Sequence, residues 1–395
     1  MKTRVGEEAV IVAGVGQTPF NRRRDGTGIR DWAVAALDAA LDMAGLARGD
    51  LDALVIASES DMLTAQPNPA GVLADELGLA GVAAWRVEGG GASGQLAVHS
   101  GVRAILAGQA ARVAVVGLDP SASALAAGDV AHVYSISFDA LAEGLAGLTA
   151  TEIYALSFRL FAAETGLGAG ALADITRDHR ARACANPDAH LPRRHTVEEI
   201  AAAPIIAAPY RRLHCAPFSD GAAAVILCRR RAAPATRAGA PRVSGIGAAS
   251  DRVHLGARAR PERFDAKGRA LARATTMAGI TPGQIGLAEI YDPYAGAALQ
   301  ALDALGLSTD IAGDLAAGAF ERDGRLPVNL SGGLLGQGAP AGAVGVAQTG
   351  ACARLLEGCY HPGAQPAAEP AHALADTHGG IATTCAATIL SVGAG

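Results

Sequence analysis

The chain repeats one order of secondary structure in its two halves, and this repeat constrains the fold more than any single segment does. In the first half, the short apolar segment 85–88 leads into a glycine-rich turn at 89–94 and then into a helix. In the second half, residues 327–330 lead into a glycine-rich turn and helix in the same order, with the counterpart of the first turn at 331–345. The sequence therefore predicts an internal duplication of ~100–150 residues per half.

Strands and helices alternate along both halves. Apolar runs of strand length are separated by segments with apolar residues at three-to-four spacing, which predicts βαβ units around a parallel core. The predicted strands are 9–16, 51–57, 85–88, 111–117, 222–228, 241–247, 285–290 and 381–390, and the predicted helices are 29–44, 69–77, 92–106, 149–165, 172–185, 263–278, 295–305 and 342–356.

The repeat suggests two domains with one insertion. We predict an N-terminal half at 1–235 and a C-terminal half at 240–395, joined by an Arg/Ala/Pro/Thr-rich linker. A Ser/Ala/Gly-rich start followed by helical spacing predicts an inserted loop domain at about 119–195, lying over the sheet.

Composition excludes several classes of protein. A net charge of −5 gives no electrostatic footprint for nucleic acid. The six cysteines lack C-x-x-C spacing, so we expect neither a zinc site nor a disulfide framework. Arg103 and Arg112 interrupt the longest apolar run and Glu7 and Glu8 interrupt the N-terminal one, so we expect no membrane span and no signal peptide. A cytoplasmic metabolic protein fits these features.

Four motifs carry a resemblance to a known family. They are VEGGGASG at 87–94, RLHCAPFSDGAAAV at 212–225, EIYDPY at 289–294 and NLSGGLLGQGAPAGAVG at 329–345. In this order they resemble the thiolase superfamily, specifically the thiolase-like proteins related to sterol-carrier-protein thiolases and bacterial lipid-transfer proteins. The resemblance covers essentially the whole chain. It implies an α/β thiolase fold, five-layered αβαβα from two duplicated βαβαβαββ halves, an obligate homodimer, and acyl-CoA thioester substrates.

The catalytic positions of that family are altered here. The nucleophilic cysteine falls on Gly91, the histidine of the Gly-His-Pro turn falls on Ala339, and the oxyanion-hole position falls on Tyr291. The C-terminal loop, expected at 376–380, has no cysteine. Glycine cannot be acylated and alanine cannot act as a base, so the thiolase route of covalent acyl transfer is not expected.

Three polar residues remain as catalytic candidates. Tyr291 and Asp292 follow a predicted buried strand, where the active sites of α/β proteins gather, and can exchange a proton with a substrate. His378 lies in a glycine-flanked turn beside the position where the family has its second cysteine. The structural alternatives are that Asp292 caps the next helix, that Tyr294 only packs, and that His378 is a solvated loop residue.

Substrate contacts are expected from the two glycine-rich turns. Their backbone N–H groups can point at a thioester oxygen, because glycine allows close approach. Cys215 and Cys385 are expected to be structural. The predicted substrate-binding residues are Gly91, Ala92, Ser93, Tyr294, Gly338 and Ala339.

The leading interpretation is an enzyme that makes or breaks a carbon–carbon bond on a CoA thioester by aldol or retro-aldol chemistry. It would bind no cofactor or metal, with coenzyme A present only as part of the substrate. Lipid-transfer-type relatives work with a small zinc-ribbon/OB-fold partner, which the resemblance makes plausible here. The alternatives are a non-catalytic acyl-CoA-binding or scaffolding subunit, and an acyltransferase of thiolase or ketoacyl-synthase type with relocated residues.

Overall fold

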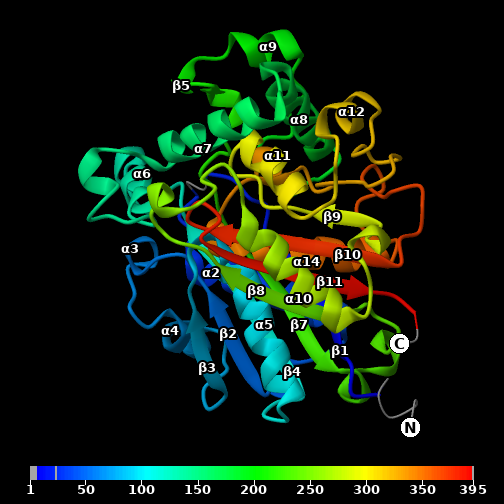
Figure 1. Cartoon of the computed structure of the whole chain (residues 1–395). Helices are drawn as coiled ribbons and strands as arrows, with labels where there is room; N and C mark the ends of the chain where they lie inside the picture. Colours follow the sequence, from blue (N-terminus) through cyan, green and yellow to red (C-terminus); the bar gives the residue numbers. More distant parts are fainter. Residues whose placement is uncertain (1–6, 23–24, 394–395) are drawn as a thin grey trace.

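A computed structural model describes residues 7–22 and 25–393. Its centre is a nine-stranded mixed sheet in the order β3-β2-β4-β7-β1-β8-β11-β10-β9, with helices on its faces (Figure 1). The strands of this sheet are β1 Val10–Gln17, β2 Ala53–Ala57, β3 Ala83–Val87, β4 Arg112–Pro120, β7 Asp220–Arg229, β8 Arg242–Ser250, β9 Leu287–Glu289, β10 His372–Gly379 and β11 Thr384–Ser391. A separate small sheet contains β5 Ile205–Ala207 and β6 Tyr210–Arg211.

The strand order repeats between the halves. In the first half, the first strand β1 lies beside the last strand β7, followed by β4, β2 and β3. In the second half, β8 lies beside β11, followed by β10 and β9, and a parallel bridge from Ala288 to Val328 stands where β3 stands in the first half. Within the sheet, the two halves meet between β1 and β8, where Ile11 pairs with Arg242 and the N–H of Val12 donates to the backbone oxygen of Pro241 at 2.9 Å. The architecture is the thiolase fold that the sequence predicted.

Helices form three layers around the two halves of the sheet. The central helices α5 and α14 contact strands of both halves, whereas α2 covers the outer face of the first half and α10 that of the second (Figure 1). The helices are α2 Ile29–Ala44, α3 Asp61–Thr64, α4 Pro69–Glu76, α5 Ser93–Leu106, α6 Ala127–Ser135, α7 Ala150–Thr165, α8 Ala169–Ala183, α9 Val197–Ala202, α10 Asp265–Ala278, α11 Ala295–Ala304, α12 Ile311–Ala316, α13 Gly333–Gln337 and α14 Ala341–Leu356.

Paired glycines explain why these outer helices pack so closely. A Cβ atom added to Gly14 in β1 would collide with the backbone oxygen of Ala40 in α2. A Cβ atom added to Gly245 in β8 would collide in the same way with the backbone oxygen of Ala274 in α10. The duplication therefore extends from the strand order to the packing of individual residues.

Helices α6, α7 and α8 lie within 119–195, where the insertion was predicted, and together with α9 they cover one end of the sheet (Figure 1). Its α7 and α8 pack on α11 of the second half through a shared aromatic core, which includes Phe158 and Tyr210. The division into domains at 1–235 and 240–395 stays a prediction, and its outer limits lie outside the described residues. No helix within 7–22 and 25–393 is both long and apolar enough to cross a membrane.

One sequence prediction about the C-terminal part is wrong. Residues 376–379 belong to β10, a central strand between β9 and β11, and do not form a loop. The resemblance and the neighbouring glycines indicated a loop, but Asp376, Thr377 and His378 are all buried in the strand. Asp376 forms an ion pair of 2.5 Å with the fully buried Lys267, which offsets part of the cost of burying its charge.

Candidate active site

A cavity of about 830 Å³ lies between the insertion and the sheet. The carboxyl ends of β2 and β10, the turn before α5 and the residues that follow β9 all contribute to it, so both halves of the duplication form its walls. Most of its remaining wall comes from α6 and α7 and from the segment 212–218. Of the predicted site residues, those that line the cavity are Gly91, Tyr291, Tyr294, Ala339 and His378.

Gly91 leaves room for the side chain of Tyr291. A Cβ atom at position 91 would lie 2.6 Å from the backbone oxygen of His378 and 2.7 Å from Cζ of Tyr291, and closer still to the tyrosine hydroxyl. Real Cβ contacts are longer than 3.0 Å, so no side chain fits there without displacing its neighbours. The Tyr291 hydroxyl thus fills the space in which the family resemblance placed a cysteine.

The turn around Gly91 is held by its own side chains. The hydroxyl of Ser93 donates to the backbone oxygen of Gly90 at 2.6 Å and accepts from the N–H of Gly89 at 3.0 Å. Ser93 and Ala92 are buried and lie outside the cavity lining, although both were predicted to bind substrate. Ser93 therefore stabilises the turn, and of residues 91–93 it is Gly91 that lines the cavity.

Tyr291 keeps its proton. Burial, reinforced by the charges of Glu59 and Asp119, raises the pKa of Tyr291 well above its ordinary value. Its hydroxyl makes no hydrogen bond within the described parts of the chain, so its O–H is free to donate to a ligand in the cavity.

His378 is a neutral imidazole whose tautomer follows from its partners. The hydroxyl of Tyr154 lies 2.6 Å from the Gly380 backbone oxygen, which can only accept, and 2.7 Å from Nε2 of His378. Tyr154 therefore donates to Gly380, and Nε2–H donates to Tyr154, which leaves the lone pair on Nδ1. Burial, together with the charges of Lys267 and Arg258, lowers the pKa of His378 well below its ordinary value.

The lone pair on Nδ1 of His378 is unpaired inside the protein: this buried atom has no hydrogen-bond partner among the residues that the structure describes. The His378 ring also packs edge-on against the ring of Tyr291, with 4.8 Å between centroids. The cavity thus brings together a neutral hydroxyl donor and a neutral nitrogen acceptor, the two groups that a general acid–base reaction requires.

Tyr294 belongs to an aromatic wall. Its ring stacks on Tyr210 with 5.3 Å between centroids, and its hydroxyl lies 2.9 Å from that of Thr151. Burial raises the pKa of Tyr294, so it stays neutral. Its hydroxyl already has a partner, which distinguishes it from Tyr291.

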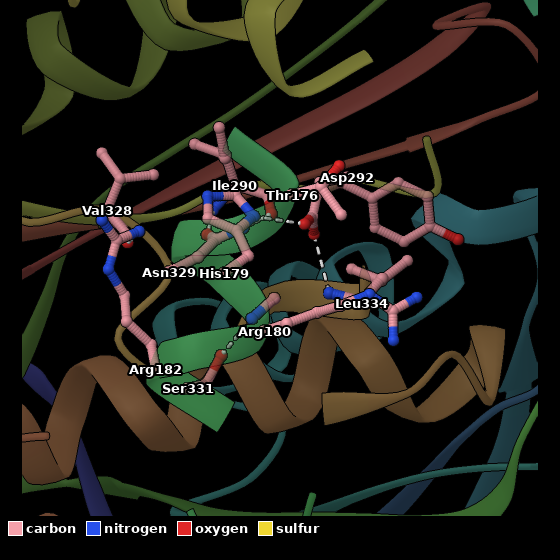
Figure 2. A network of polar contacts seen from close by, with 12 residues as sticks. Thr176, His179, Arg180, Arg182, Ile290, Asp292, Val328, Asn329, Ser331 and Leu334 are labelled. Atoms are coloured by element: carbon pink, nitrogen blue, oxygen red, sulfur yellow. Dashed lines mark hydrogen bonds and ion pairs between the residues drawn. The ribbon is translucent and has the colours of Figure 1, made fainter. Parts of the chain in front are cut away.

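Asp292 points away from the cavity, into a buried network behind Tyr291. Figure 2 shows its carboxylate between the ring of His179 on α8 and the backbone of Leu334 on α13. Oδ2 lies 2.7 Å from Nδ1 of His179, and Oδ1 accepts the Leu334 N–H at 2.7 Å. The α11 helix begins after Tyr294 without a side-chain cap, so Asp292 does not cap it. Asp292 ties the segment that carries Tyr291 to two other elements.

Further contacts fix the backbone around Tyr291. Asn329 accepts the Ile290 N–H at 2.6 Å and donates to the Ile290 oxygen at 3.1 Å (Figure 2). On the other side, the Tyr291 N–H lies 3.4 Å from Oδ2 of Asp376, which is paired with Lys267. Tyr291 is therefore held by buried polar contacts from both directions.

The Gly338–Ala339 turn retains its position but offers no base. Ala339 lines the cavity, and its N–H donates to the hydroxyl of Ser219 at 3.0 Å. Gly338 lies outside the lining; a Cβ atom there would meet Ser219 and His190 at 2.6 and 3.0 Å. The histidine beside it, His190, makes a 2.7 Å contact with Ser219 and does not line the cavity.

The cysteines near the cavity are poor nucleophiles. Cys215 lines the cavity, but burial raises the pKa of its thiol to about 12. Cys385 lies opposite His378 in the β10–β11 pair, yet it is buried, outside the lining, and has a pKa also raised by burial to about 12. Nucleophilic cysteine chemistry requires a thiolate, which neither environment favours.

Several cavity residues were missed from the sequence. Glu59 follows β2, Tyr154 lies on α7, and Arg193 and Arg212 lie at the exposed part of the lining. The position of Glu59 after a predicted strand was the one available signal, whereas the others lie in the insertion or near it. No cluster of three or more histidine, cysteine or acidic residues that could hold a metal occurs in the described ranges.

Comparisons with known proteins identify the family. Residues 247–392 match the family described as Thiolase C-terminal domain-like. The chain is 32% identical to an acetyl-CoA acetyltransferase of Methanothermobacter thermautotrophicus, covering 88% of this chain and 91% of that protein. The chain therefore belongs to the thiolase superfamily.

One further relative has a lyase name, and one structural neighbour has an aldolase name. The chain is 29% identical to the 17-hydroxy-3-oxo-4-pregnene-20-carboxyl-CoA lyase of Mycobacterium tuberculosis, over 45% of this chain and 47% of that protein. Among solved structures, the Ltp2-ChsH2(DUF35) aldolase superposes with a TM-score of 0.80 over 98% of both chains at 24% identity, a likeness of fold.

Proposed function

We propose that the chain is a thiolase-fold lyase that makes or breaks a carbon–carbon bond on a CoA thioester by aldol or retro-aldol chemistry, without an acyl-enzyme. The observation that carries this proposal is the position of Tyr291: its hydroxyl fills the space beside Gly91, where the resemblance places the thiolase nucleophile. With Ala339 in place of the activating histidine, the cavity retains acid–base groups and lacks a covalent catalyst.

The two polar groups suit retro-aldol cleavage of a β-hydroxyacyl thioester. The β-hydroxyl gives its proton to a base, the Cα–Cβ bond breaks, and its electron pair passes to the thioester as an enolate. His378 offers the lone pair of Nδ1 as the base, and Tyr291 donates a hydrogen bond to the oxygen that becomes the carbonyl. Backbone N–H groups at the Gly91 turn, before the N-terminus of α5, would hold the enolate oxygen.

The wider cavity suits a CoA thioester. Arg193 and Arg212 are exposed in the lining and offer guanidinium groups to the phosphates of coenzyme A. The inner wall is aromatic and apolar, with Tyr154, Tyr294 and Phe138, and can enclose an acyl group. The relative from Mycobacterium tuberculosis, named as a carboxyl-CoA lyase, supports the same reaction class.

The alternatives fit these contacts less well. A non-catalytic acyl-CoA-binding or scaffolding subunit would not need an unpartnered Nδ1 of His378 beside a free hydroxyl of Tyr291. An acyltransferase with a relocated nucleophile would need a reactive thiol, and burial keeps the Cys215 thiol protonated at neutral pH because its pKa lies at about 12.

The test uses the full chain with a panel of β-hydroxyacyl-CoA thioesters. Liquid chromatography with mass spectrometry should detect the shortened acyl-CoA and its carbonyl co-product. The Tyr291→Phe variant should lower cleavage about 10²–10⁴-fold. The matched control, Tyr294→Phe, removes a hydroxyl that is engaged by Thr151 and should cost less than 10-fold. Equal losses in both variants, or no cleavage of any thioester, would reject the proposal.

We also propose that the chain acts as a homodimer. Strand β3 is at the edge of the nine-stranded sheet, and pairing of this edge with a second copy would satisfy its free backbone groups. Light scattering should give the mass of a dimer, and a monomer mass at micromolar concentration would contradict it.

A zinc-ribbon/OB-fold partner is a further proposal. The connection between α6 and α7 lies beside the cavity and exposes 82% of Leu141 and 80% of Leu145, which supports an apolar docking surface there. Addition of a zinc-ribbon/OB-fold protein from the same genome should raise cleavage, and Leu145→Glu should abolish that increase. Unchanged cleavage by the wild-type chain would reject this partner.

A further inference from the structure

Glu59 is a buried acid in the same cavity that the proposed reaction has not used. It follows β2 at the carboxyl end of that strand, and only 8% of its surface is exposed. Its side chain lines the cavity together with Gly91, Tyr291 and His378. It thus lies with the residues on which the proposed aldol chemistry depends.

One oxygen of Glu59 has no partner. Oε1 lies 3.4 Å from the hydroxyl of Ser137, and a Cβ atom added to Gly90 would lie 3.9 Å from the same oxygen. Oε2 is buried and makes no hydrogen bond to any residue in the described ranges. Leaving a buried carboxyl oxygen unpaired is unfavourable, and the cost is larger for a charged group, which favours the protonated form of Glu59.

The neighbouring acid Asp119 differs from Glu59 in that its carboxylate accepts hydrogen bonds from the backbone. Its carboxylate accepts the Glu59 N–H at 3.1 Å and the Gly342 N–H at 2.5 Å, so its oxygens are engaged by backbone donors. Glu59 has no such donors, and burial, with the charge of Asp119, raises the pKa of Glu59 well above its ordinary value. Burial raises the pKa of Asp119 as well, to about 7, so both acids of this pair favour the protonated form more than an exposed carboxyl does.

Other charged and titratable groups also face this acid pair. Besides burial and the charge of Asp119, the charge of Glu88 before the Gly91 turn raises the pKa of Glu59, whereas the nearby hydroxyls of Tyr134 on α6 and Ser137 lower it. Arg86 on β3 is the nearby cation; it is paired with Asp61 and favours the charged form of Asp119. The surroundings of Glu59 therefore contain more acidic groups than basic ones.

We propose that Glu59 transfers the proton at Cα of the bound CoA thioester. In the retro-aldol direction, its O–H protonates Cα of the enolate that bond cleavage releases, and the enolate electron pair forms the new C–H bond. Glu59 is left as a carboxylate and regains a proton from solvent. In the aldol direction, the carboxylate removes the Cα proton to form the enolate. This inference rests on the proposed function, because it assigns the second of the two proton transfers in that reaction.

The inference is tested apart from carbon–carbon cleavage. The full chain is incubated with propionyl-CoA, a thioester that has Cα protons and no β-hydroxyl, in D₂O. Mass spectrometry should show deuterium entering Cα. The Glu59→Gln variant, nearly isosteric with the protonated acid, should lower the exchange rate at least about 100-fold.

Glu88→Gln is the matched control. Glu88 is an exposed acid that accepts the Gly90 N–H, and glutamine retains that acceptor. This variant should exchange within about 3-fold of the wild-type rate. If Glu59→Gln does not fold, the wild-type pH profile decides: exchange needs the carboxylate and should rise with pH, whereas cleavage needs the acid and should fall.

The outcomes separate the two proposals. Exchange that depends on Glu59, without cleavage of any β-hydroxyacyl-CoA, supports the role of Glu59 and rejects the lyase. Cleavage with normal exchange in Glu59→Gln rejects the role of Glu59 and leaves the lyase standing. Absence of exchange in the wild-type chain also overturns the role of Glu59.

Discussion

The replacement of Gly91 by alanine tests the geometry of the cavity most simply. The added methyl carbon would lie 2.6 Å from the backbone oxygen of His378 and 2.7 Å from Cζ of Tyr291. Gly91 has no left-handed backbone conformation, so alanine adds a steric conflict without backbone strain. The carbonyl belongs to the central strand β10 and cannot retreat far, so the Tyr291 ring must move.

The expected magnitude follows from this conflict. Relief to ordinary contact requires a displacement of about 1 Å, and overpacking of this kind costs about 1–3 kcal/mol of unfolding free energy. A displacement of about 1 Å in a catalytic group lowers the rate on the order of 10²-fold. Gly91→Ala should therefore be both less stable and much less active than the wild-type chain.

Urea denaturation and the cleavage assay measure the two effects. Gly170→Ala in α8 is the control, because a Cβ atom there has no neighbour within 4 Å. It should be neutral or stabilising by up to about 1 kcal/mol. Tyr291→Phe removes the atom nearest to the added methyl group, so the double variant should lose less stability than the sum of the single variants. Wild-type stability and activity in Gly91→Ala would refute the placement of the Tyr291 hydroxyl.

Three other predictions concern burial, positioning and CoA binding. Burial lowers the pKa of His99 to about 3, so below pH ~6.5 the unfolded chain binds more protons than the folded chain does. The difference in unfolding free energy between the wild type and His99→Gln should therefore shrink by roughly 2 kcal/mol between pH 6.5 and 5. A constant difference in urea denaturation would contradict this. His179→Ala removes the side-chain partner of the buried Asp292 and should lower the free energy of unfolding, measured by urea denaturation, by about 3–5 kcal/mol. A loss below about 1 kcal/mol would show that the pair is not buried as described. Arg193→Ala should raise KM for an acyl-CoA by about 3–10-fold and leave KM for the matching acyl-pantetheine unchanged, and equal changes for both would exclude a phosphate contact.

The fold was predictable because the same order of strand, glycine-rich turn and helix occurs in both halves of the sequence. The helix predicted at 29–44 is α2, and the two glycine-rich turns each precede a central helix. Strand β10 was missed because Asp376, Thr377 and His378 are polar and lie next to glycines. The buried carboxylate of Asp376 is paired with Lys267, more than a hundred residues earlier, and no local pattern contains that contact.

The candidate site was only partly predictable. The family resemblance led to Gly91 and Tyr291, but it did not predict that the Tyr291 side chain fills the space beside Gly91. The orientation of Asp292 depends on His179 in the insertion, which has no sequence signal of its own. Glu59 was missed because a single acid after a strand is common, and only the tertiary structure shows its unpaired oxygen.

The central claim is that this cavity works on a CoA thioester without an acyl-enzyme. The most direct measurement mixes the full chain with a β-hydroxyacyl-CoA and, separately, with a 3-ketoacyl-CoA plus free CoA, and records both the small products and the intact protein mass. We predict cleavage of the β-hydroxyacyl-CoA to an acyl-CoA and a carbonyl compound, no thiolysis, and an unchanged protein mass. A protein mass increased by one acyl group, or thiolysis of the 3-ketoacyl-CoA, would contradict the claim.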